Sequence, residues 1–158
     1  MKNRTMYLLI ALLGMNLLAL PTLAQDQPPV PDPEAIAQRA VERPTKLAEH
    51  CIAKNRTTAE RCTELIKKLL ENDRKKAARK VARQCIRRIN HRSDVCVDHI
   101  KRVCRRAVQA LLEAGAPNLA ERVERACEEL IEKVRHSQRA AVRAVRDALH
   151  NGGGGDPA

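Results

Sequence analysis

The segment CIAKNRTTAERCTELIKKLLENDRKKAARKVARQCIRRINHRSDVC, residues 51–96, decides the fold of this chain because its cysteines are spaced symmetrically. They form an outer and an inner pair that share one midpoint, inside the polar run ENDR at 71–74. The pairs are Cys51 with Cys96, and Cys62 with Cys85. Two antiparallel helices joined by a short turn bring residues equidistant from that turn side by side. The spacing therefore predicts a helical hairpin with two disulfide rungs, Cys51–Cys96 and Cys62–Cys85.

A second turn signal, AGAPN at 114–118, is equidistant from Cys104 and Cys127. This symmetry predicts a third rung, Cys104–Cys127. Reflection about the same turn also pairs apolar residues with apolar residues over a long stretch. These pairs are Leu112 with Leu119, Val108 with Val123, Ile100 with Ile131, Val97 with Val134, Ile89 with Val142 and Ile86 with Val145. Apolar residues recur at helical spacing throughout. We therefore expect an all-α, disulfide-stapled, antiparallel bundle of three long amphipathic helices.

A rival interpretation follows from an internal repeat, since residues 47–70 resemble residues 81–104 at an offset of 34. Such an offset is typical of helix-turn-helix repeats. It predicts five shorter helices and local disulfides within each Cys-x10-Cys pair. The apolar pairs that continue past His91 favour three long helices, and the repeat interpretation stays open.

The twin Cys-x10-Cys pairs also resemble, in geometry, the coiled-coil-helix-coiled-coil-helix class, whose pairs are spaced Cys-x9-Cys. The resemblance covers residues 51–96, and we transfer no function from it.

The chain divides by composition into four parts. Residues 1–24 have a basic start, an apolar run and a small-residue end, which predict a secretory signal cleaved near Ala24. Residues 25–33 form a Pro-rich tether, 34–150 the helical bundle domain, and 151–158 a Gly-rich flexible tail.

A proline divides the first part of the bundle domain. Pro44 predicts a short helix over 34–42 followed by a new helix, because proline lacks the N–H that a helix interior needs.

Export to a periplasm or the exterior makes paired cysteines the expected state of all six. Beyond Tyr7 the chain has no aromatic residue, so disulfides would compensate for a core of small and aliphatic side chains. The formal net charge is +11, of which Lys2 and Arg4 in the signal contribute two. A charge this basic favours anionic surroundings.

The strongest candidate for a binding function is a basic segment, residues 74–92, that contains no acidic residue. On a helix it forms a stripe, which we call the basic stripe. Its members are Lys76, Arg79, Lys80, Arg83 and Arg87. The stripe predicts binding to an anionic polymer or surface, such as a nucleic acid backbone or lipopolysaccharide, with at most peripheral membrane contact. The alternatives are a solvated face or one paired with Glu residues of a neighbouring helix.

Other function classes have weaker signals. His50, His91 and His99 lie near cysteines and, with free thiols, could form a metal site of a periplasmic metal or stress sensor. An uncovered apolar stripe would instead indicate a structural protein partner. With no nucleophile elbow, phosphate loop or Cys-x-x-Cys motif, we expect no enzyme, no cofactor and no small-molecule substrate.

Overall fold

The structure, a computed structural model, describes residues 32–151. It contains three helices, α1 (Pro33–Glu71), α2 (Lys75–Glu113) and α3 (Pro117–Asn151). Together the three helices span residues 33–151. The predicted signal, most of the tether and most of the Gly-rich tail lie outside the described residues.

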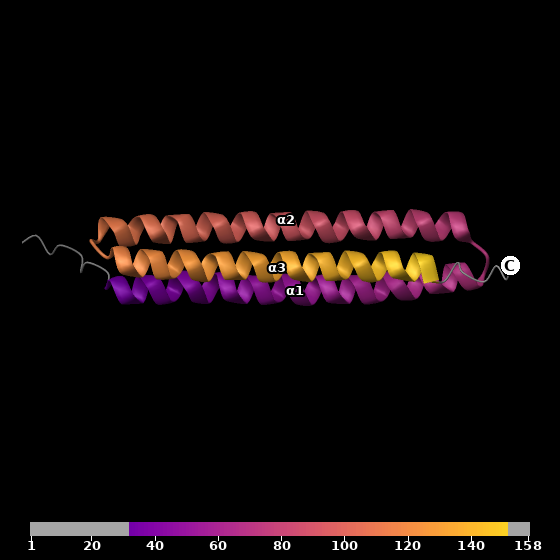
Figure 1. Cartoon of the computed structure of the whole chain (residues 1–158), viewed down its shortest axis with the longest axis horizontal. Helices are drawn as coiled ribbons and strands as arrows, with labels where there is room; N and C mark the ends of the chain where they lie inside the picture. The colour runs from indigo at the N-terminus through magenta and orange to yellow at the C-terminus, as the bar shows by residue number, and fades with distance from the viewer. Residues whose placement is uncertain (1–31, 152–158) are drawn as a thin grey trace, which may run out of the picture. The chain divides into compact units, whose positions relative to one another are not determined.

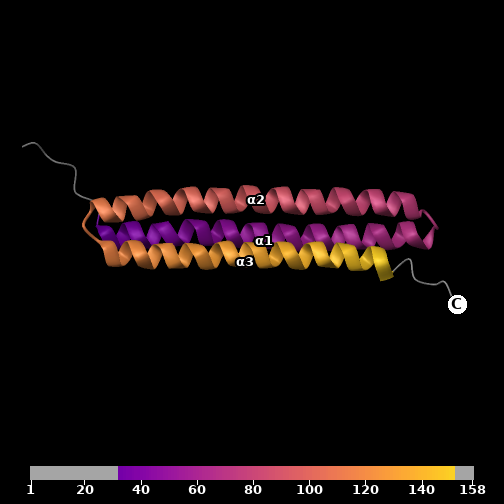
Figure 2. The same cartoon turned by 45° about the horizontal axis from the view of Figure 1, so that its top comes forward.

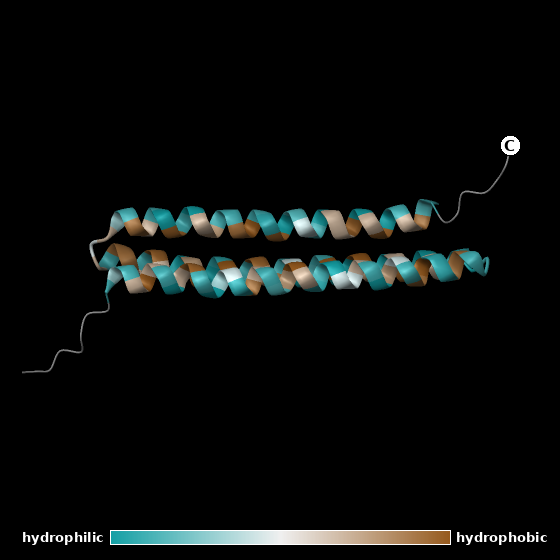
Figure 3. Cartoon of the chain, turned by 90° about the horizontal axis from the view of Figure 1, so that it is seen from below, coloured by the Kyte–Doolittle hydropathy of each residue, from teal (hydrophilic) through white to brown (hydrophobic). Residues whose placement is uncertain are grey.

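The three helices lie side by side, and consecutive helices run in opposite directions (Figures 1 and 2). Each helix packs against both of the others. Apolar residues follow the inner side of each helix and polar residues its outer side (Figure 3). The predicted all-α bundle of three long helices is confirmed.

Three disulfides staple the bundle and follow the predicted ladder. Cys51–Cys96 and Cys62–Cys85 join α1 to α2, with Cα–Cα distances of 6.7 and 6.3 Å. Cys104–Cys127 joins α2 to α3 at 6.3 Å. The five-helix alternative with local disulfides is wrong, because α1 and α2 each continue unbroken through both of their cysteines in the hairpin. The three disulfides indicate an oxidising compartment, extracellular or periplasmic.

Both turns close their preceding helix in the same way. Asp73 N–H donates to Leu70 O and the next N–H, of Arg74, reaches back to Leu69 O. The N–H groups of Gly115 and Ala116 repeat this pattern on the end of α2. These are Schellman motifs, which require a left-handed residue after the cap. Asp73 takes this conformation with φ 52° and Gly115 with φ 70°.

The predicted break at Pro44 is wrong, since α1 continues through it. Pro44 is fully buried among the helices, so its ring contributes apolar packing at a position where it removes one backbone hydrogen bond. In addition, Thr45 donates its hydroxyl to the carbonyl of Val41 at 2.8 Å. Tertiary packing therefore overrides the local preference of proline.

One predicted apolar pair is also wrong. Leu112 is 50% exposed, and its neighbour Leu111 is buried in its place. The other residues paired by reflection about Gly115 lie in the core or pack against it.

The core is divided into two clusters by a buried polar layer. Asn55 on α1 donates through Nδ2 to Ser93 Oγ on α2 at 2.8 Å, and both residues are fully buried. The Oδ1 atom of Asn55 has no partner in the described bundle. We name the two halves after their turns. The Asp73 half comprises 56–92 and 139–151, and the Gly115 half comprises 32–54 and 94–138.

Candidate anion-binding surface

The basic stripe lies on the outer side of α2 in the Asp73 half. All five of its side chains are exposed. The opposite side of this helix buries Ala78, Ala82 and Ile89 in the core. The Cys62–Cys85 disulfide fixes the same segment to α1. Core packing and a disulfide thus hold the stripe in one orientation.

The charges of the stripe are not paired within the protein. Between residues 32 and 151, none of its five members forms a salt bridge or a side-chain hydrogen bond. In the Asp73 half, Glu60 and Glu64 of the neighbouring α1 are paired along their own helix instead. For example, Lys68 donates to Glu64 at 2.7 Å, and this hydrogen bond lowers the pKa of the Glu64 carboxyl. The expected alternative, pairing with Glu residues of a neighbouring helix, is therefore not found for these five residues.

The start of α2 adds to the positive potential. Its first turn contains no acidic residue, and Arg74 at the N-cap provides no side-chain cap. The nearest carboxylate, Asp73, lies 3.7 Å from Lys75. Helix N-termini carry partial positive charge and favour acidic neighbours. Basic residues here oppose the helix dipole, so helix stability does not explain them.

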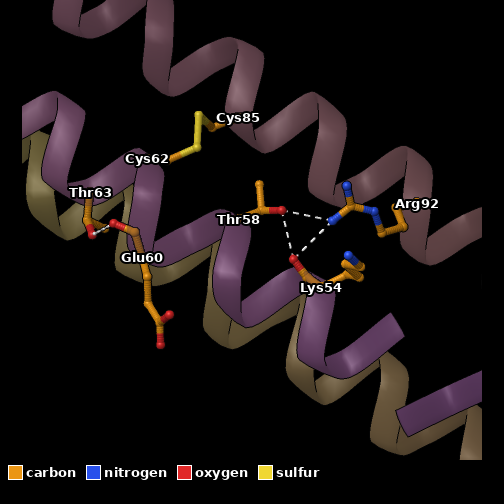
Figure 4. Close-up of a disulfide and its surroundings, with 7 residues drawn as sticks. All are labelled: Lys54, Thr58, Glu60, Cys62, Thr63, Cys85 and Arg92. Carbon is orange, nitrogen blue, oxygen red and sulfur yellow. Dashed lines mark hydrogen bonds between the residues drawn. A yellow bond between two sulfur atoms is a disulfide. The ribbon is translucent and has the colours of Figure 1, made fainter. Parts of the chain in front are cut away.

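Arg92, the last member of the basic segment, has a structural role. Its guanidinium donates to Lys54 O at 3.0 Å and to Thr58 Oγ1 at 2.8 Å, both on α1 (Figure 4). It therefore links the two helices of the hairpin. Its charge contributes less to the outer surface than those of the exposed stripe residues.

Part of the stripe borders a hollow that is open to solvent. This hollow has a volume of about 610 Å³ and is lined by Lys80, Arg83, Gln84, Ile86 and Arg87. Three of its five residues are cationic and one is apolar.

The structure also shows a charge distribution that sequence analysis missed. The Asp73 half carries sixteen Lys and Arg against five Asp and Glu, while the Gly115 half carries twelve of each. The net charges are thus +11 and 0. The basic second half of α3, with Arg139, Arg143 and Arg146, lies at the same end of the bundle as the stripe (Figure 1). The antiparallel fold was the missing signal, because it brings these two segments together.

The metal alternative finds no support in the arrangement of ligands. All six cysteines are in disulfides, so no thiolate is present. His50, His91 and His99 are all exposed. Within the described part of the chain, no three His, Cys, Asp or Glu side chains converge as metal ligands would.

Exposed apolar surface is scattered along the bundle. The exposed large apolar residues are Leu65 on α1, and Val95 and Leu112 on α2. They lie at different levels of the bundle and so form no continuous stripe for a partner protein. None of the three helices has an apolar stretch of membrane-spanning length.

Comparisons with known proteins give no further guidance, since no family model, curated protein or solved structure matches the chain.

Proposed function

We propose that this protein is an exported, non-enzymatic helical module that binds an anionic polymer or surface through the basic stripe of α2. One observation carries the proposal. Five exposed cations follow one face of α2 from its first turn onward, where they repel one another, and no carboxylate of residues 32–151 forms an ion pair with them. An arrangement that disfavours folding and is not compensated within the fold is typical of a binding surface.

The proposed location follows from the sequence and the disulfides together. Cleavage of the secretory signal near Ala24 would release the bundle into a periplasm or the exterior. Oxidised cysteines are stable there.

The test is a salt titration of binding to a polyanion, with heparin-type polysaccharide as a simple probe. We expect affinity to fall steeply as salt rises, because each neutralised anionic group releases counterions. Charge reversal in the triple variant Lys80→Glu, Arg83→Glu and Arg87→Glu should abolish binding.

A matched control separates the stripe from net charge alone. The triple variant Lys101→Glu, Arg102→Glu and Arg105→Glu makes the same charge change at exposed positions of the same helix, in the Gly115 half. It should retain most of the affinity. Equal losses in the two triple variants, or binding that is insensitive to salt, would refute the proposal.

A further inference from the structure

The flank of α2 that faces α3 contains an ion pair in the Gly115 half. Arg135 of α3 donates to Asp94 Oδ1 of α2 at 2.6 Å. Next to it, Gln138 of α3 donates to Asn90 of α2 at 2.8 Å. These two contacts define which side of each helix lies along the α2–α3 flank.

The relative placement of Asp94 and Arg135 recurs at a second pair of positions, eleven residues earlier on α2 and eleven residues later on α3. The residues at the second pair of positions are different. Positions eleven apart point only about 20° away from each other around a helix and lie about 16 Å apart along it. Arg146 follows Arg135 at this interval on α3, and Arg83 precedes Asp94 at this interval on α2. Because the helices are antiparallel, Arg146 and Arg83 occupy equivalent positions on the flank. Where the first level pairs an arginine with a carboxylate, the second brings together two exposed arginines.

Nearby acidic side chains do not neutralise this pair. Segment 74–93 of α2 contains no acidic residue, and segment 133–146 of α3 contains none either. Asp147 follows immediately but lines a hollow with Thr63 and Lys67 of α1, on the other side of α3. Glu132, the acidic residue that precedes this segment of α3, is bonded to Arg139.

We infer that Arg83 and Arg146 together bind one phosphate of a double-stranded nucleic acid whose backbone runs along the α2–α3 flank. The inference rests on the proposed function and extends its site from one helix to two. Guanidinium groups bind phosphate oxygens through paired N–H donors, and two of them can share one phosphate. Lys76, Lys80 and Arg87 continue the row along α2 at steps of about 4.5–6 Å, where successive backbone charges can be met.

The surroundings favour a duplex over a lipid surface and over a single strand. The exposed large apolar residues lie on α1 or in the Gly115 half, so the flank lacks an apolar anchor for lipid. Single strands are bound by stacking on aromatic rings, and the chain has no Phe or Trp.

The experiment measures binding of a fluorescent 20-base-pair DNA duplex by anisotropy, with the oxidised chain at several salt concentrations. We expect Arg83→Gln and Arg146→Gln each to weaken binding roughly fivefold at about 0.15 M salt, and the double variant, which no longer neutralises the shared phosphate, to reduce the salt slope by about 0.9. The double variant should lose less than the product of the two, because both side chains bind the same phosphate.

The control is Lys133→Gln, which removes an exposed charge from α3 in the Gly115 half and should change affinity by less than about twofold. Helicity and thermal midpoint establish that each variant is folded.

If Arg83→Gln weakens binding while Arg146→Gln matches the control, the two-helix site is wrong and the proposed function survives on α2. Preference for vesicles with anionic lipid over the duplex would overturn the nucleic acid partner. Absence of binding to every polyanion would instead overturn the proposed function itself.

Discussion

The two halves of the bundle have the same helical architecture but differ in how they are held and in their charge. In the Gly115 half, Cys51–Cys96 and Cys104–Cys127 link all three helices covalently. In the Asp73 half, Cys62–Cys85 links α1 to α2, and α3 is held there by packing. The surface of the first half is neutral and that of the second carries +11. Stability is thus concentrated in one half and charge in the other.

The cores of the two halves also differ, and the Gly115 half has the larger buried apolar side chains. Residues buried in the Gly115 half include Ile100, Leu111 and Leu130 together with three valines. The Asp73 half buries five alanines around Ile66, Ile89 and Val145. Less apolar area is therefore removed from water where like charges also repel. The Gly115 half acts as the scaffold on which a less favourable, basic half is built.

The largest expected effect tests this division through two disulfides of equal span. Cys62–Cys85 and Cys104–Cys127 both join residues separated by 23 positions. Replacing both members of Cys104–Cys127 with Ser should lower the free energy of unfolding by about 3 kcal/mol, since this bond is the covalent link of α3 to the bundle. Replacing both members of Cys62–Cys85 should cost less, because the outer bond Cys51–Cys96 still closes the hairpin loop.

Urea denaturation of the two double variants measures the difference. A second readout is amide hydrogen exchange, in which loss of Cys104–Cys127 should deprotect the whole of α3. If the two double variants are equally destabilised, Cys51–Cys96 does not compensate for the loss of Cys62–Cys85. The proposed difference in stability between the halves would then lose its main support.

The next prediction concerns the polar layer that separates the two cores. Ser93→Ala removes the partner of Asn55 Nδ2 and leaves a buried amide with both polar atoms unpaired. This variant should be destabilised by about 1–3 kcal/mol. In Asn55→Leu with Ser93→Ala both polar groups are gone, so stability should return to that of the parent or exceed it.

Thermal and urea unfolding of the single and double variants check this layer. If Ser93→Ala alone leaves the free energy of unfolding unchanged, a water molecule or a rearranged side chain forms hydrogen bonds with Asn55. The polar layer then contributes less to stability than its contacts indicate.

Most of the fold was predictable because cysteine spacing and apolar periodicity report the same antiparallel pairing. Leu111 and Leu112 could not be distinguished, since reflection about a turn gives the level of a residue but not its side of the helix. The course of the chain at Pro44 depended on tertiary burial, which no local pattern contains. These failures have a common cause: each depends on which side chain the neighbouring helices cover.

The candidate site was only partly predictable for a related reason. The basic stripe of α2 lies within one continuous basic segment, residues 74–92, which composition alone revealed. The basic end of α3 is far from the stripe in sequence, and its proximity to the stripe follows from the direction of α3 in the bundle. Arg92 belongs to the same basic segment, but its bonds to Lys54 and Thr58 place it between two helices, which composition could not show.

The two turns allow a smaller test, because the same motif uses different residues in each half. Gly115→Ala places a side chain at φ 70°, and a Cβ there would meet no atom within 4 Å. The expected cost is therefore backbone strain alone, about 1 kcal/mol. Asp73→Gly should change stability by less than about 0.5 kcal/mol, since Asp tolerates this conformation and Gly adds entropy to the unfolded chain.

The free energies of unfolding of these two variants give the comparison directly. A cost for Gly115→Ala well above this figure would show that the turn of the scaffold half is constrained by more than its backbone conformation.

The smallest expected effect is a change in the free energy of unfolding that has opposite signs in the two halves. Arg135→Gln breaks the ion pair with Asp94 and should lower the free energy of unfolding by about 0.5 kcal/mol. Arg146→Gln makes the same change eleven residues later, where the facing residue is Arg83, and should raise it. Both effects should shrink as salt increases, because added ions screen attraction and repulsion alike. Urea unfolding at low and high salt provides the measurement. If Arg146→Gln destabilises the ligand-free protein at low salt, Arg146 has a partner within the protein. Its charge is then not left unpaired for an external anion.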